Sequence, residues 1–260
     1  GAEALIGLAN YQSSATITIA DTLPNLLLLS TASLPHNGGV LATTPIELSA
    51  DATASVAQMN ALAALSQYAS FSRNGHTITV EDSGLHLAGF TATGSAIPAS
   101  YVMVGDATLT DLQALVLANQ HATIGDNVLT IADTPDDLLA LDPSVNAMAT
   151  RLSLSGSATA TTGQITSLAE DSRFTTGGYA LTVTGTALGL LGLAQATQQL
   201  ATTLELSTAD SVDVSHLVSL AELGSRFTRD GFGLTVADSA AQLATLNNLE
   251  TALVTGATLN

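Results

Sequence analysis

The segment "LTVADSAAQLATL" at residues 234–246 is one of five related stretches that recur along the chain. The others are "ITIADTLPNLLLL" from Ile17, "ITVEDSGLHLAGF" from Ile78, "LTIADTPDDLLAL" from Leu129 and "LTVTGTALGLLGL" from Leu181. Successive starts lie 61, 51, 52 and 53 residues apart. A recurrence of about 52 residues, with an insertion in the first copy, indicates a repeat array. We number the repeats copies 1 to 5.

Each stretch predicts a short strand followed by a short helix. The opening order apolar, Thr, apolar is typical of a strand with one buried face. A Thr or Ser then stands where a helix N-cap is expected, at Thr22, Ser83, Thr134, Thr186 and Ser239. Four residues later comes a leucine, with a second apolar residue three positions on, as on the buried stripe of a helix. We expect Leu138, Leu190 and Leu243 to be equally buried.

A second strand and a longer helix are predicted inside each copy. The second strands are expected at 46–48, 102–104, 152–154, 204–206 and 257–260, with residue pairs such as Val80 and Met103 always 23 apart. The longer helical patterns end at Phe71, Phe174 and Phe227. A glycine four residues further on allows the chain to turn into the next strand, at Gly75, Gly178 and Gly231.

Ten strands that all return in one direction require parallel pairing with right-handed crossovers. The predicted fold is therefore α/β: a right-handed parallel β/α solenoid of about ten coils, in which one repeat forms two coils. Residues 1–260 are expected to form a single solenoid domain. A pure β-solenoid is the alternative.

The chain is strongly acidic. It has 22 Asp and Glu residues against five Arg and no Lys, and its net charge of −17 argues against nucleic-acid partners and against anionic membranes. Stacking would align Asp21, Asp82, Asp133 and Asp238 along one edge, with Asp51, Asp106 and Asp210 between them. Such an edge could attract Ca²⁺, but turn formation and helix capping by Asp are the favoured interpretation.

No motif predicts a catalytic, cofactor or metal site. Gly185, Gly189 and Gly192, with Glu205, imitate a dinucleotide fingerprint, but the glycine spacing is wrong and packing is the better explanation. The histidines share no metal-ligand spacing: His36, His76, His86, His121 and His216. Arg73, Arg173 and Arg226 gather near one corner of the coil, where salt bridges to the acidic edge would explain them. We expect a protein that is not an enzyme.

The outer face of the predicted sheet is small and polar, unlike the Tyr-, Trp- and Arg-rich surfaces of binding hot spots. Its residues are Thr18, Glu47, Thr79, Val102, Thr130, Ser153, Thr182, Glu205 and Thr235.

No apolar run approaches the roughly 18 residues of a membrane span. The first residues match the helix half of a coil and the last ones the strand half. We therefore expect a fragment of a longer array or a subunit that stacks end to end into a filament. Leu253, Val254 and Leu259 would then lie against Ala4, Leu5 and Leu8 of a following copy, or against further repeats.

Phrases of the type "LTVADSAAQLATL" resemble the Ala/Thr/Leu-rich repeats of very large secreted or surface proteins of proteobacteria, some of which act in adhesion or in the biofilm matrix. The resemblance covers nearly the whole chain and carries no catalytic residues. It implies a structural and adhesive segment at the cell surface or outside the cell, with matrix or surface components as partners. A protein-recognition solenoid and a self-assembling filament subunit are the alternatives.

Overall fold

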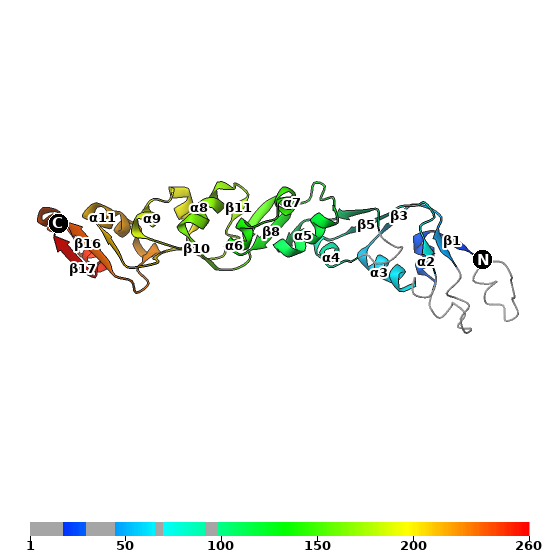
Figure 1. Cartoon of the computed structure of the whole chain (residues 1–260), viewed down its shortest axis with the longest axis horizontal. Coiled ribbons are helices and arrows are strands. Elements are labelled where there is room, and N and C mark those ends of the chain that lie inside the picture. Colours follow the sequence, from blue (N-terminus) through cyan, green and yellow to red (C-terminus); the bar gives the residue numbers. More distant parts are fainter. Residues whose placement is uncertain (1–17, 30–44, 66–69, 92–97, 260) are drawn as a thin grey trace. The chain divides into compact units, whose positions relative to one another are not determined.

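In the computed structural model the chain is an α/β protein. The structure describes residues 18–29, 45–65, 70–91 and 98–259. The chain divides into two compact units, Gly1–Leu129 (unit 1) and Thr130–Asn260 (unit 2). All strand pairs in the described residues are parallel and form five small sheets (Figure 1). The twelve α-helices of the same residues rule out the pure β alternative. The single domain and the ten-coil solenoid stay predictions.

Unit 1 contains two complete small sheets. One has the order β1 (Ile19–Asp21), β2 (Ile46–Leu48), β4 (Phe71–Ser72), and the other β3 (Ala52–Ala54), β5 (Ile78–Asp82), β6 (Ser100–Met103). Thr123 forms a parallel bridge with Val102 at the edge of β6, and β7 spans Ala107–Leu109. The helices are α2 (Leu23–Leu27), α3 (Val56–Leu65), α4 (Gly84–Ala88) and α5 (Asp111–Asn119).

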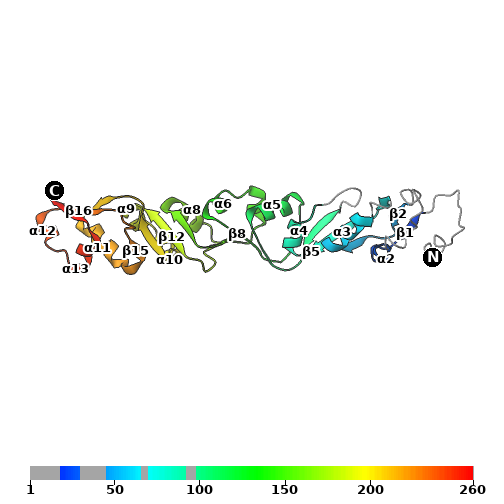
Figure 2. The same ribbon diagram turned by 90° about the horizontal axis from the view of Figure 1, so that it is seen from below.

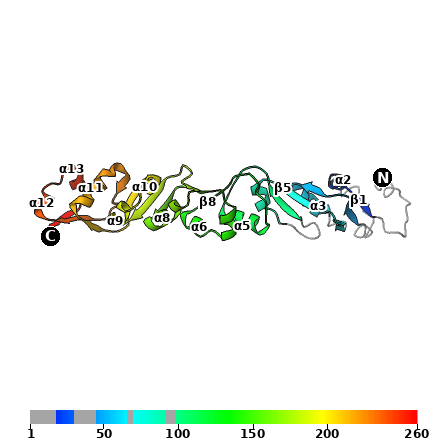
Figure 3. The same ribbon diagram turned by 90° about the horizontal axis from the view of Figure 1, so that it is seen from above.

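Unit 2 also consists of small parallel sheets and short helices (Figures 2 and 3). Its sheets contain β8 (Leu129–Asp133), β9 (Arg151–Leu154), β11 (Phe174–Thr175); β10 (Ala158–Thr161), β12 (Leu181–Gly185), β13 (Thr203–Leu206), β15 (Phe227–Thr228); and β14 (Asp210–Val212), β16 (Leu234–Asp238), β17 (Gly256–Leu259). The helices are α6 (Pro135–Leu139), α7 (Pro143–Met148), α8 (Thr162–Glu170), α9 (Ala187–Leu191), α10 (Gln195–Leu200), α11 (Val214–Glu222), α12 (Ala240–Leu243) and α13 (Asn248–Leu253), with the 3₁₀-helix η3 (Gly224–Arg226).

The predicted strand pairs form, but in a different register. Val80 lies opposite Tyr101 and Val183 opposite Leu204, a step of 21 residues where 23 was expected. A shift of two residues keeps every side chain on the same face of the sheet, so the alternation of apolar and polar residues cannot distinguish the two registers.

The expected helix ends at the phenylalanines are wrong. Helix α8 ends at Glu170 and α11 at Glu222, whereas Phe174 and Phe227 belong to the two-residue strands β11 and β15. Phe71 lies in β4, and all three side chains are buried. Each phenylalanine packs from an extended segment beyond the helix.

Side-chain capping is confirmed in four of the five short helices. Ser83, Thr134, Thr186 and Ser239 accept a hydrogen bond from the amide three residues later. Thr22 has the extended backbone of an N-cap, but its side chain makes no capping bond. The reciprocal bond of a full capping box is instead found on the longer helices, for example between Thr161 and Gln164 of α8.

The core consists of the predicted leucines and the inward strand residues. Leu26, Leu87, Leu138 and Leu190 are buried, whereas Leu243 is only half-buried, so the expectation of equal burial is wrong for copy 5. No long helix packs beside α12 in the described residues as α11 packs beside α9.

The predicted glycine turns are confirmed. Gly75, Gly178 and Gly231 have φ values of +84°, +84° and +82°, and the residue before each also has positive φ. Two consecutive residues of this kind are typical of type I′ turns, which require glycine or a short polar residue.

Candidate functional site

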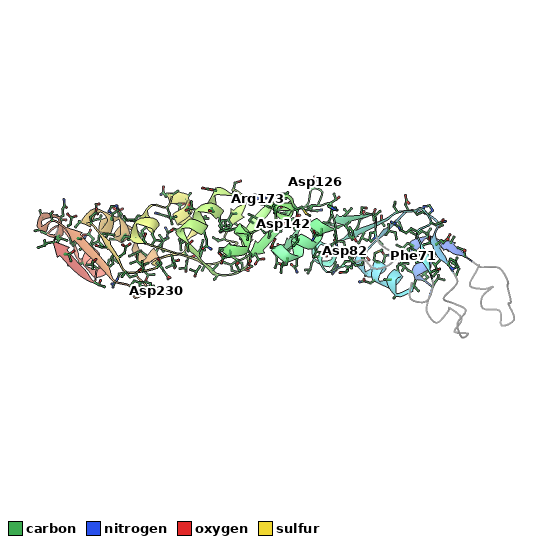
Figure 4. All side chains as sticks on the ribbon, viewed as in Figure 1. Phe71, Asp82, Asp126, Asp142, Arg173 and Asp230 are labelled. Carbon is green, nitrogen blue, oxygen red and sulfur yellow. The ribbon has the colours of Figure 1, made fainter. Side chains whose placement is uncertain are left out.

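Five aspartates form the most regular polar feature of the described residues. Each accepts a hydrogen bond from a backbone amide that lies 22 to 26 residues away. We call them the clamp carboxylates: Asp51, Asp82, Asp106, Asp210 and Asp238. Figure 4 labels Asp82 as an example in unit 1.

Three of the clamp carboxylates bind the first amide of a helix. Asp82 Oδ2 accepts from Val56 N of α3 at 2.9 Å. Asp210 Oδ2 accepts from Ala187 N of α9 at 2.7 Å, and Asp238 Oδ2 accepts from Val214 N of α11 at 3.2 Å. The first amides of a helix have no partner within the helix, and the positive end of the helix dipole favours an anion there. These carboxylates therefore attach a helix to a strand that is distant in sequence.

The other two clamp carboxylates bind amides that lead into strands. Asp51 Oδ1 accepts from Thr77 N at 2.8 Å, one residue before β5. Asp106 Oδ1 accepts from Val128 N at 2.7 Å, one residue before Leu129. Both bonds fix the point at which the chain enters the next strand.

The aspartates at the strand ends also bind locally, as the capping interpretation predicted. The Oδ1 atoms of Asp21, Asp82, Asp133 and Asp238 accept the amide of the following residue at 2.7 to 2.9 Å. The turn and capping role of this row is therefore confirmed. Calcium binding stays untested.

Hydrogen bonds keep several of these carboxyls ionised. Burial opposes ionisation of Asp82, but bonds from the His86 ring, from Val56 N and from Ser83 N hold its pKa below the ordinary value near 3.8. The Thr77 amide lowers the pKa of Asp51. Asp213, the N-cap of α11, has its pKa lowered to about 2 by the His216 amide and the Ser215 hydroxyl.

Copy 4 lacks a carboxylate at the strand end. Gly185 ends β12 where Asp82 ends β5, and a Cβ atom at Gly185 would lie 2.6 Å from Thr162 Cγ2 at the start of α8. The side chain of Thr162 thus fills the space of the absent carboxylate. The amide of Gly189 is bonded to Thr186 Oγ1 at 3.1 Å, so Gly185 and Gly189 serve packing and helix capping, as expected.

Two arginines bind the carboxyl ends of helices. Arg173 Nη1 donates to the carbonyls of Asn146 and Ala149 at 2.8 and 2.9 Å, at the end of α7. Arg226 Nη2 donates to the carbonyls of Gln198 and Ala201 at the end of α10. Arg173 forms a salt bridge of 2.6 Å with its neighbour Asp171, which is not part of the predicted acidic edge, and Arg226 contacts carbonyls instead. Cations at this end stabilise the helix dipole.

Three histidines of the described residues, His76, His86 and His216, each lie near one aspartate. His86 Nδ1 and His216 Nδ1 each lie 2.7 Å from Asp82 and Asp213, and His76 lies 3.5 Å from Asp51. Residues 18–29, 45–65, 70–91 and 98–259 hold no group of three or more His, Asp or Glu that could bind a metal ion. His36 lies outside the described residues.

The outer sheet positions are half-buried or exposed, as expected, and Thr79 Oγ1 lies 2.9 Å from Ser100 Oγ across the β5–β6 pair. None of the helices in the described ranges is both long and apolar enough to cross a membrane.

Comparison with known proteins identifies no relative: no family model, no curated protein and no solved structure matches the chain.

Proposed function

We propose that the chain is a structural and adhesive repeat segment of an extracellular or cell-surface protein and is not an enzyme. In this proposal its sheets and helices belong to a right-handed β/α solenoid that supplies length, stiffness and a repetitive surface. Its partners are neighbouring repeats of the same polypeptide, or further copies stacked end to end, and surface or matrix components. Nucleic-acid binding and membrane insertion have no role in it.

The clamp carboxylates carry this proposal. A carboxylate oxygen of Asp82, of Asp210 and of Asp238 accepts a hydrogen bond from the backbone of a helix more than 20 residues away. Arg173 and Arg226 act likewise at helix ends. The stability of a stacked array depends on contacts between neighbouring repeats. Hydrogen bonds from these side chains to the backbone of a neighbouring segment strengthen such contacts.

Protease treatment of intact cells tests the location. With antibodies against residues 130–260, the proposal predicts that the signal disappears when intact cells that express the natural gene are treated with protease. Complete protection until the cells are lysed contradicts a surface location. Adhesion is tested separately with protein-coated beads on abiotic and matrix-coated surfaces, against beads coated with albumin.

A protein-recognition role is the second candidate, and one observation favours it. Leu85 on α4 and Leu112 on α5 have exposed fractions of 57% and 74%, and these two helices pack against each other. Exposed leucines on adjacent helices are typical of contact surfaces. Beads coated with the Leu85→Ser/Leu112→Ser variant test it: adhesion equal to that of the unmodified chain argues against this surface.

A further inference from the structure

Most of the small sheets end in the same way. Phe71–Ser72 pair with Ile46–Glu47 of β2 in unit 1. In unit 2, Phe174–Thr175 pair with β9 and Phe227–Thr228 with Leu204–Glu205 of β13. The outermost strand of each of these sheets is thus a Phe-Thr or Phe-Ser segment that follows a long helix.

Two sheets lack such a segment in the described residues. The outer edge of β6 is bridged by Thr123, whereas no described residue pairs with the outer edge of β17. Ala257 lies opposite Val236 as Leu204 lies opposite Val183, so Ala257–Thr258 correspond to the positions that Phe227–Thr228 cover in β13. In β9 the amide of the corresponding residue, Leu152, donates outward to the carbonyl of Arg173 at 3.1 Å.

Burial differs at equivalent positions. Leu259 is 71% exposed, whereas Leu206, which holds the same register position in β13, is 1% exposed. Leu243 of α12 is half-buried, whereas Leu190 of α9 is fully buried next to α11. Figure 1 shows β17 close to the C-terminus, and Figures 2 and 3 show α12 and α13 there. The uncovered surface therefore combines the open edge of β17 with the side chains of Leu243 and Leu259. Around α9 the corresponding surface is covered by the helix α11.

We infer that α12 and β17 form a docking surface for one more coil of this repeat, with an amphipathic helix like α11 and a Phe-Thr strand like β15. The inference rests on the proposed array function and names the partner of one of its faces. The helix of the partner would cover Leu243 with residues spaced like Leu217 and Leu220, and its Phe-Thr strand would pair with Ala257–Thr258. This arrangement continues the contacts that β15 and α11 already make with β13 and α9.

Extension of the chain tests this pairing. Asn260 corresponds to Ser207 in the repeat, so a copy of residues 208–233 is appended after Asn260. The matched control carries Leu→Asp and Phe→Asp at the appended counterparts of Leu220 and Phe227. Hydrogen exchange at the Ala257 amide should be at least about tenfold slower with the unmodified extension than with the control, because the amide becomes bonded. The thermal midpoint should rise only with the unmodified extension.

Two outcomes overturn the inference. Equal exchange at Ala257 in the two extended chains shows that the repeat pattern does not fit this face. If the unextended chain associates as its concentration rises, and Leu259→Asp abolishes the association, the face binds a second copy rather than a further coil. Both measurements use purified protein, so they are independent of the protease test of surface location.

Discussion

Asp82 and Gly185 occupy the same position, at the ends of β5 and β12, but hold the neighbouring helix by different means. At Asp82 a carboxylate reaches Val56 N at the start of α3. At Gly185 no acidic side chain of the described residues bonds the amide of Thr162, and the threonine side chain packs over the glycine. The comparison indicates that these acidic residues do more than make the surface soluble. Where glycine replaces the aspartate, the side chain of Thr162 occupies the space of the carboxylate.

The largest expected effect concerns packing. Leu190→Ala should lower the free energy of unfolding by about 2 to 5 kcal/mol, because the side chain is fully buried and its removal leaves a cavity. Leu243→Ala, at the equivalent but half-buried position, should cost less than half of that. Chemical denaturation of both variants measures the difference, and equal losses would show that the two positions are packed alike.

Removal of a clamp carboxylate should have the next largest effect. Asp82→Ala leaves Val56 N, Ser83 N and His86 without this acceptor and should cost about 1 to 3 kcal/mol. Asp82→Asn keeps one acceptor oxygen and should cost less. Thermal melts at pH 7 compare the two variants; if alanine is tolerated without loss, the bond to α3 contributes nothing to stability.

Acid should weaken the fold in a defined range. The pKa values of Asp51, Asp82 and Asp213 lie below 3.8 in the folded chain, so the unfolded chain takes up protons first as the pH falls. Their contribution to the free energy of unfolding is complete above about pH 4 to 5. It is lost as the pH falls through their pKa values in the folded chain, which for Asp213 is about 2. The thermal midpoint of Asp213→Asn should fall less steeply between pH 5 and about pH 2 than that of the unmodified chain. Parallel curves would contradict this linkage.

A carboxylate can be introduced in copy 4. Gly185→Asp alone should destabilise unit 2, because its Cβ would meet Thr162 Cγ2. After Thr162→Ala the same change should be tolerated, with a coupling of about 1 kcal/mol in a double-mutant cycle. Additive losses would indicate that the backbone around Gly185 cannot place a carboxylate over α8.

The arginine contacts should have the smallest effect. Arg226→Met keeps much of the aliphatic stem but removes the donors to Gln198 and Ala201, and should cost about 1 kcal/mol. Arg173→Met also breaks the pair with Asp171 and should cost somewhat more. Both losses are measured by denaturation at low salt and again at high salt, where the difference between the variants should shrink.

Local features could be predicted from the sequence because they depend on residues close together in the chain. Examples are the strand at 78–82, the cap at Ser83 and the turn at Gly75. The register at Val80 was wrong by two residues, because a shift of two preserves the inward and outward faces. The strand at Phe174 is not predicted, because no proline ends the helical pattern that precedes it.

The polar contacts could be predicted only in part. The local bond of Asp238 to Ser239 N follows from its position before a helix. Its bond to Val214 N depends on which strand lies beside β16 and in which register, and the repeat alone does not determine that. Arg226 was assigned to acidic partners for the same reason: the end of α10 lies next to it only in the folded chain.

Hydrogen exchange at four backbone amides tests the central claim most directly. Val56, Ala187, Val214 and Thr162 all stand at the first position of a helix, where no intrahelical acceptor exists. If carboxylates attach the helices, the amides of Val56, Ala187 and Val214 should exchange at least about tenfold more slowly than the amide of Thr162. Of these four amides, Asp82→Ala should accelerate exchange only at Val56. Exchange of Val56 as fast as Thr162 in the unmodified chain would contradict the account.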